Sequence, residues 1–113
     1  MKLVNRNKNT VLAEHVSFLS GTLEKTRGLL STHFPRAIFF KTRWGIHTIG
    51  MRFSIDVVVM DTKYRVRKIK CALVPNKFFF WNPRYYNVLE LPEGTIKKSG
   101  TEIGDTLAWK EEK

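Results

Sequence analysis

Residues 47–61 read HTIGMRFSIDVVVMD, and this stretch carries the strongest β-strand signal in the chain. Its second half, residues 55–60, is apolar at every position except Asp56. Side chains alternate along a strand, so the odd-numbered residues of this segment are expected on one face and the even-numbered residues on the other. A strand that is apolar on both faces is covered on both sides, and the pattern therefore predicts a central core strand.

The totals of the sequence limit its class. At 113 residues, the chain is expected to be a single domain spanning residues 1–113. Hydrophobic residues make up 42% and charged residues 27%, which is typical of a globular protein with its own core. Cys71 is the only cysteine, which excludes an internal disulfide and a cysteine-based zinc cluster.

No apolar run approaches the ~20 residues that span a membrane, and the N-terminus lacks the apolar core of a signal peptide. The sequence therefore predicts a cytoplasmic protein, although the same N-terminus would remain after a leader had been removed. The formal net charge is +10, from 20 Lys and Arg against 10 Asp and Glu. This charge favours nucleic acid, an acidic surface or a small anionic ligand as partner. A basic surface that serves only solubility is the alternative.

Short strands and frequent turns run through the rest of the chain. We expect strands over residues 2–5, 10–18, 37–40, 55–60, 65–74, 88–91 and 106–110, and a helical turn over residues 95–99. The best helix candidate spans residues 20–31, since Ser20 or Thr22 can cap it and leucines recur near helical spacing. About seven or eight short strands with one short helix near residues 20–30 predict a mostly β domain, a compact sandwich or barrel. A strand-rich α+β layer is the alternative.

Many catalytic and cofactor motifs are missing from the sequence. It has no glycine-rich phosphate loop, no dinucleotide fingerprint, no HExxH and no Gly-x-Ser-x-Gly element. His15, His33 and His47 lack metal-ligand spacing, so we expect no metal site and no cofactor. A His47–Asp56 acid–base pair is chemically feasible, but the sequence indicates neither substrate nor nucleophile. A hydrolase-like enzyme is therefore the weakest hypothesis.

Asp56 is the sharpest candidate for a site, because a carboxylate in a core strand needs a cation or several donors. In a purely structural role, the carboxylate of Asp56 would pair with an arginine or pin a loop in the interior. In a functional role, it would lie beside a pocket. His47 and Thr48 precede Gly50, where a bend can bring a titratable imidazole toward the carboxylate. The hypothesis is a binding or accessory module with a small-ligand site. Its candidate residues are Arg27, His47, Thr48, Met51, Asp56 and Glu90.

The segment from Phe78 to Tyr86, FFFWNPRYY, is unusually aromatic and follows a basic strand. Cations beside aromatic side chains suit single-stranded nucleic acid, which gives a nucleic-acid-binding module as the alternative function. The same composition fits docking to a membrane surface or self-association into a homo-oligomer. An aromatic core with a solvated basic edge is the structural explanation. The candidate residues for this surface are Arg65, Arg67, Lys68, Lys70, Phe79, Trp81 and Arg84.

The run HTxGMRFxIDVV of residues 47–58 resembles the signature of domain-of-unknown-function family 192 of bacteria and archaea. Three other elements are similar to that family's pattern and occur in its order: RGL at residues 27–29, LELPEG at 89–94 and GD at 104–105. The resemblance covers nearly the whole chain. It implies a compact, mostly β domain of sandwich type, and it implies no established activity. The aromatic segment of residues 78–86 lies outside this pattern.

Overall fold

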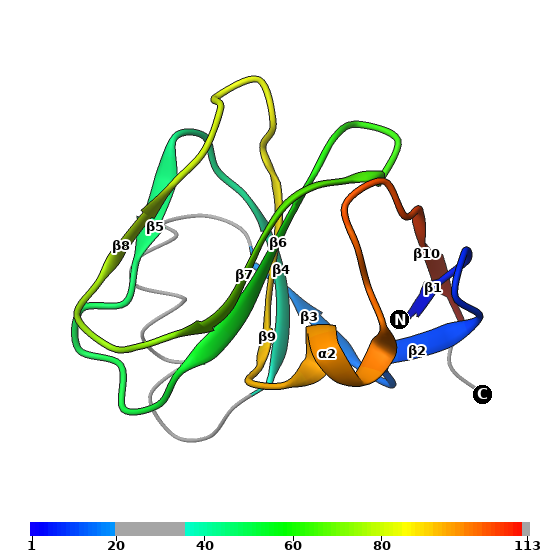
Figure 1. The fold of residues 1–113 in the computed structure, drawn as a ribbon, viewed down its shortest axis with the longest axis horizontal. Coiled ribbons are helices and arrows are strands. Elements are labelled where there is room, and N and C mark those ends of the chain that lie inside the picture. The colour runs from blue at the N-terminus through cyan, green and yellow to red at the C-terminus, as the bar shows by residue number, and fades with distance from the viewer. Residues whose placement is uncertain (20–35, 112–113) are drawn as a thin grey trace.

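The computed structural model describes residues 1–19 and 36–111, which contain ten strands and one short helix (Figure 1). The strands are β1 (Lys2–Asn5), β2 (Thr10–Ala13), β3 (Val16–Phe18), β4 (Ala37–Lys41), β5 (Gly45–His47), β6 (Ile55–Met60), β7 (Val66–Leu73), β8 (Phe78–Phe80), β9 (Asn87–Pro92) and β10 (Leu107–Lys110). The helix is α2 (Thr95–Ser99). The prediction of a strand-rich fold is confirmed, and the described strands close no barrel.

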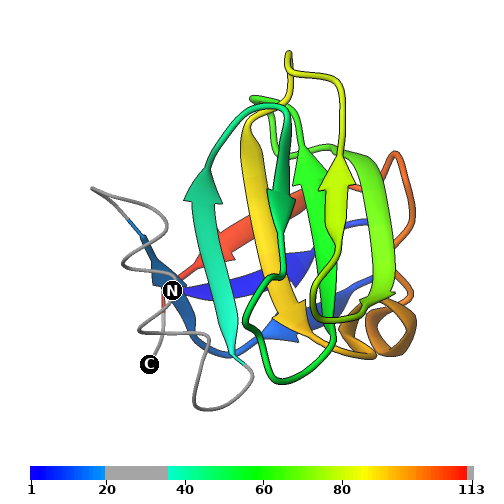
Figure 2. The same ribbon diagram turned by 90° about the vertical axis from the view of Figure 1, so that its left-hand side faces the viewer.

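The strands form three stacked layers, which run from right to left in Figure 1. A three-stranded sheet has the order β10-β1-β2, a five-stranded sheet the order β3-β4-β9-β6-β7, and a two-stranded sheet pairs β5 with β8. Figure 2 views the stack from the β5–β8 side, where the strands of the three-stranded sheet cross those of the central sheet at a steep angle. This is the steep packing expected of two twisted sheets that share one core.

The number of strands exceeds the prediction for two reasons. The predicted strand over residues 10–18 divides at Glu14 and His15, so that β2 joins the three-stranded sheet and β3 the central one. The two three-residue strands β5 and β8 were not predicted, because each is stabilised by pairing with a segment more than thirty positions away, from Gly45 to Phe80 and from His47 to Phe78. The predicted helix over residues 20–31 lies outside the described residues.

β6 is the centre of the fold, as its sequence predicts. It pairs antiparallel with β7 on one edge and β9 on the other, and all six of its residues are buried. Val58 and Met60 pack between the central and three-stranded sheets, whereas Val57 and Val59 pack toward the β5–β8 layer. The predicted alternation is therefore confirmed, and β6 contributes to two separate hydrophobic cores.

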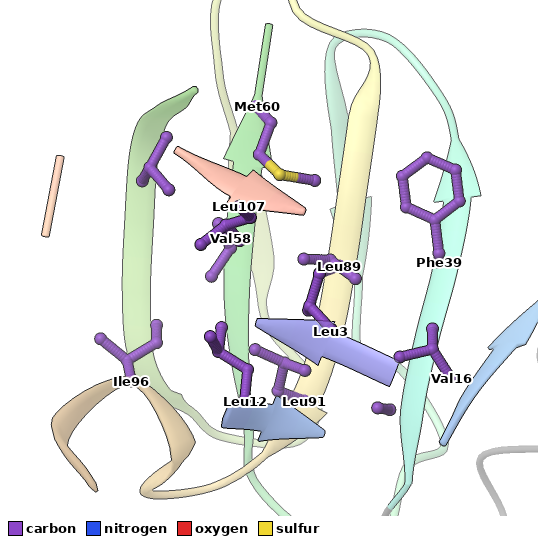
Figure 3. Close-up of a cluster of buried hydrophobic side chains, with 12 residues drawn as sticks. Leu3, Leu12, Val16, Phe39, Val58, Met60, Leu89, Leu91, Ile96 and Leu107 are labelled. Carbon is purple, nitrogen blue, oxygen red and sulfur yellow. The ribbon is translucent and has the colours of Figure 1, made fainter. Parts of the chain in front are cut away.

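The first core lies between the central sheet and the three-stranded sheet (Figure 3). It includes Leu3 from β1, Leu12 from β2, Leu107 from β10 and Ile96 from α2. The second core lies under the β5–β8 sheet, where Ile46 and Phe79 cover β6 and its neighbours. Full burial of one such aliphatic side chain stabilises a fold by roughly 1.5–3 kcal/mol. A few buried residues on each covering sheet therefore contribute several kcal/mol to the stability of the fold.

A polar clasp ties the β1–β2 turn to the turn before β10. The side-chain amide of Asn5 donates through Nδ2 to Asp105 Oδ2 at 2.9 Å and to Thr101 Oγ1 at 3.1 Å. Lys8 Nζ lies 3.0 Å from Asp105 Oδ1, and the backbone N–H of Glu102 donates to Oδ2 of the same carboxylate. Burial acts to raise the pKa of Asp105, but these donors outweigh it and hold that pKa below its ordinary value.

The clasp makes the stability of the domain pH-dependent in acid. A carboxylate whose pKa is lowered by folding stabilises the native state above its unfolded pKa of about 3.9, and this contribution is lost as the pH falls through the native value. We expect Asp105→Asn to be less stable than the wild type at pH 7 and the difference to shrink steadily below about pH 4. Urea unfolding of both proteins between neutral and acidic pH measures it. Glu102→Gln is the control, since the exposed side chain of Glu102 contacts only Lys8 of the clasp. A stability difference between Asp105→Asn and the wild type that stays constant with pH would contradict a lowered pKa for Asp105.

Candidate functional site

Thr48 is a structural staple at the end of β5. Its hydroxyl donates to the carbonyl of Val74 at 2.7 Å and accepts the N–H of Lys77 at 2.9 Å. Its backbone N–H donates to the carbonyl of Lys77, and its carbonyl accepts the N–H groups of Met51 and Asn76. These bonds join the turn after β5 to the turn before β8, and they place the two-stranded sheet over the second core.

Asp56 satisfies its buried carboxylate with backbone amides. It is 1% exposed; Oδ1 accepts the N–H of Ala72 at 3.0 Å, and Oδ2 accepts those of Gly94 at 3.1 Å and Ile96 at 2.9 Å. Ala72 lies at an irregularity in the β6–β7 pairing and has a φ of 53°, while the other two amides belong to the start of α2. Of the alternatives expected for Asp56, the described contacts match the carboxylate that pins a loop.

The residues predicted for a small-ligand site lie on both sides of the central sheet. Asp56 points toward the first core and α2, whereas His47 lies on β5, beyond the second core. Glu90 is buried between Leu89 and Leu91 of the first core, so alternation directs it to the side of β5 and away from Asp56. Met51 packs against the second core, and Arg27 lies outside the described residues.

The outer face of the β5–β8 sheet carries exposed aromatic side chains. Phe78 and Phe80 are 60% and 62% exposed, with ring centroids 5.9 Å apart and planes within 6° of parallel. The ring of His47 meets Phe78 edge-on at 6.1 Å. Trp44, which is 67% exposed, precedes β5 and accepts a backbone hydrogen bond from Trp81. We call the stacked rings of Phe78 and Phe80, with the adjoining His47 ring and the exposed Trp44, the aromatic face.

The aromatic face differs from the predicted one in which rings point outward. Phe79 and Trp81 are buried in the second core, with centroids 5.7 Å apart, so the exposed positions are Phe78 and Phe80. Consecutive residues of a strand point to opposite faces, and the face of each phenylalanine depends on the register with β5. Ile46 pairs with Phe79 on the inner side; the alternation of a buried Ile46 between Gly45 and His47 was the available signal.

Lysines border the aromatic face. Lys68 Nζ donates to the carbonyl of Phe80 at 2.9 Å and lies 5.2 Å from the Phe79 ring centroid. Lys70 shares its side of β7, because both pair with β6 residues of the second core. Lys77 is exposed next to Phe78. These three cations flank the rings from the edge of the central sheet and from the turn before β8.

The remaining predicted cations have other surroundings. Arg67 Nε donates to Asp61 Oδ2 at 2.9 Å and lies 5.8 Å from the Tyr85 ring. Burial acts to raise the pKa of Asp61, but the N–H groups of Arg65 and Lys63 and the guanidinium of Arg67 together lower it. Arg67 is therefore partly neutralised, while Arg65 is exposed beside the same turn.

A second group of cations comes from the end of β4, the β4–β5 connection and the loop after β8. Arg43 lies 4.7 Å from the centroid of the Tyr86 ring and donates to the carbonyl of Pro83 at 2.7 Å. Lys41 lies 5.9 Å from the same ring. Arg84 is exposed at the tip of this loop. Lys41 and Arg43 therefore gather at the Tyr86 ring, away from the stacked pair of Phe78 and Phe80 in the chain.

Within residues 1–19 and 36–111, no cluster of three His, Cys, Asp or Glu side chains has a geometry that suits a metal ion. No helix in this part of the chain is long and apolar enough to cross a membrane.

Comparison with known proteins places the fold among related ones. The model of the DUF192 family, described as "Uncharacterized ACR", matches residues 3–109. The UPF0127 protein of Thermococcus sibiricus is 31% identical over 117 residues, covering 97% of this chain and 75% of the relative. The UPF0127 protein PH1112 of Pyrococcus horikoshii is 26% identical over 113 residues, covering 95% and 97%.

Two solved structures share the fold. A protein of unknown function from Novosphingobium aromaticivorans superimposes with a TM-score of 0.77 at 18% identity, over 96% of this chain and 84% of that one. A protein of Sinorhizobium meliloti superimposes with a TM-score of 0.72 at 19% identity, over 95% and 89%. At this identity the likeness concerns the fold alone.

Replacing Asp56 tests its structural role. Asp56→Ala leaves three amides without their acceptor, and each buried unsatisfied group costs roughly 1–3 kcal/mol. We expect the free energy of unfolding to fall by about 3 kcal/mol or more, and by less for Asp56→Asn, which keeps one acceptor oxygen. Urea unfolding measures both, with the exposed neighbour Glu93→Ala expected to change stability by at most about 0.5 kcal/mol. A loss of stability below about 1 kcal/mol for Asp56→Ala would show that the fold does not depend on this carboxylate.

Gly45 leaves the space that the Phe80 ring occupies. A Cβ added at Gly45 would lie 2.5 Å from Phe80 Cδ1 and 2.6 Å from the carbonyl oxygen of Phe79. We expect Gly45→Ala to shift the ring and the β5–β8 pairing, and to lower the free energy of unfolding by about 1–3 kcal/mol through overpacking. In a double-mutant cycle, Phe80→Ala should recover part of that loss. Strictly additive effects would show that the two residues do not compete for space.

Proposed function

Since the chain belongs to the DUF192 family, whose description assigns no activity, we propose a function from the geometry of its own surface: the aromatic face binds single-stranded nucleic acid. The observation that carries this proposal is the exposed pair of parallel rings at Phe78 and Phe80, bordered by lysines in a chain of net charge +10.

Stacking supplies the first part of the interaction. Every base has a π-face, so exposed aromatic rings hold successive bases with little regard to sequence, at roughly 1–3 kcal/mol per base. The rings of Phe78 and Phe80 are parallel, and on each ring the face that points away from the other ring is available for a base to stack on. Trp44, exposed just before β5, is a further aromatic side chain close in sequence to this sheet. A strand of nucleic acid laid along β8 would meet Phe78 and Phe80 in succession.

Charge supplies the second part. Lys68, Lys70 and Lys77 lie beside the rings, where their ammonium groups can meet phosphates while the bases stack. Contacts of this kind release condensed counterions and make affinity fall with salt. They position the ligand and carry no sequence information. The proposed ligand is therefore a single strand bound with weak sequence preference.

The small-ligand hypothesis has less geometric support. The carboxylate of Asp56 already accepts three N–H groups, and the hydroxyl of Thr48 holds two turns together. The carboxylate of Asp56 reaches the start of α2, whereas His47 lies on β5, so one small molecule would have to reach both sides of the central sheet to contact both residues. The ring of His47, one of the residues predicted for that site, borders Phe78 on the aromatic face.

A fluorescent oligothymidylate tests the proposal. We expect binding at low salt whose logarithm of affinity falls linearly with the logarithm of salt concentration. Phe78→Ala and Phe80→Ala should each weaken binding by about fivefold to a hundredfold, the equivalent of one lost stacking contact. Lys68→Gln and Lys77→Gln should lower both the affinity and the salt slope.

Matched controls come from the opposite side of the molecule. Ile103 is also 62% exposed, so Ile103→Ala removes a similar apolar surface, and Lys63→Gln removes a charge from the β6–β7 turn. Both should bind like the wild type. Absence of binding at low salt would falsify the proposal. Flotation with anionic lipid vesicles that depends on Phe78 and Phe80, without oligonucleotide binding, would assign the aromatic face to a membrane surface instead.

A further inference from the structure

The outer surface of the three-stranded sheet carries a second feature, independent of the aromatic face. A hollow of about 570 Å³ lies over β10, β1 and β2. Figure 1 shows that this sheet lies at the opposite end of the stack from β5 and β8. Its inner side is already covered, because Leu3, Leu12 and Leu107 pack into the first core. Residues of all three strands and of the β1–β2 turn line the hollow.

The register of the strands arranges these outward residues in rows. Leu3 and Asn5 of β1 are buried in the interior, so Lys2, Val4 and Arg6 face the hollow. Val4 lies opposite Ala108 on one side and Val11 on the other. These three small apolar residues lie at the base of the hollow; Val11 is 43% exposed and Val4 is 8% exposed beneath its neighbours.

Cations occupy both ends of this apolar floor. At one end Lys2 lies directly opposite Lys110 on the neighbouring strand, and at the other end stands Arg6. Like charges directly opposite each other destabilise a sheet. Among the residues that the structure describes, none of the three cations forms an ion pair with a carboxylate. The β1 strand thus holds an unfavourable arrangement that a bound anion would relieve.

The spacing of the cations defines the ligand. Four residues along a strand separate Lys2 from Arg6, a distance of about 13 Å at the usual rise per residue. We propose that this hollow binds an elongated organic dianion, with one anionic group at the Lys2–Lys110 end, a second at Arg6 and an apolar middle on the valine floor. Ion pairs at the two ends select the charges, and the floor removes apolar surface of the ligand from water.

Linear dicarboxylates are suitable probes. We expect dodecanedioate to shift the amide NMR signals of β1, β2 and β10, and to bind more tightly than succinate, which is too short to reach both ends. Dodecanoate, with one carboxylate, should bind about two- to fivefold more weakly than dodecanedioate. Lys110→Gln and Arg6→Gln should each reduce the affinity for dodecanedioate by a similar factor, and each should reduce its advantage over dodecanoate. Lys98→Gln, on the exposed side of α2, is the control and should have no effect.

A readout without ligand checks the charge argument separately. Lys110→Gln removes the repulsion with Lys2, so its unfolding midpoint temperature should equal or exceed that of the wild type. A lowered midpoint would show that the lysine pair is not a strained arrangement. Equal affinity for succinate, dodecanoate and dodecanedioate would overturn the two-ended site. If the oligothymidylate displaces dodecanedioate, and Lys110→Gln weakens oligonucleotide binding, the hollow belongs to a nucleic-acid surface instead of a separate site.

Discussion

The side chains of β6 lie between two layers of protein, and Val57, Val58, Val59 and Met60 have no exposed surface at all. A strand of this kind requires a cover on each face, and a chain of 113 residues has little material with which to build two. The protein meets this requirement with three stacked sheets: the central sheet carries apolar side chains on both faces, and each of the two covering sheets is small. The three-stranded sheet covers the even-numbered residues of β6, and the β5–β8 pair covers the odd-numbered ones.

This double burial also explains the polar groups in the interior. A carboxylate at position 56 has no access to water, so it requires donors, and the backbone amides of Gly94, Ile96 and Ala72 supply them. In return, one side chain fixes the start of α2 and the irregular end of the β6–β7 pairing. Thr48 does the equivalent on the other side of the sheet by joining the two turns that carry β5 and β8. Two residues from the stretch 47–61 therefore fix α2 on one side of the central sheet and the β5–β8 sheet on the other.

The sequence predicted what depends on local patterns and missed what depends on long-range register. The bounds of β6 and α2, the alternation along β6 and the family resemblance were all accessible, because each is written in consecutive residues. The strands β5 and β8 were not, since three residues carry too little pattern and are stabilised only by each other. The same limit applies to the rings: the segment of residues 78–80 had to divide between two faces, but only the pairing of Ile46 with Phe79 decides which ring is buried.

The thin covers have a consequence for function. To close the second core, the β5–β8 sheet needs apolar side chains on its inner side only, and Ile46, Phe79 and the adjoining Trp81 supply them. Its outer positions are free of that requirement, and polar residues there would leave the core unchanged. Phe78 and Phe80 nevertheless occupy these positions, with more than half of each ring in water and no burial to offset the exposure. Two large exposed rings on so small a sheet leave the apolar surface that the proposed stacking of single-stranded nucleic acid would use.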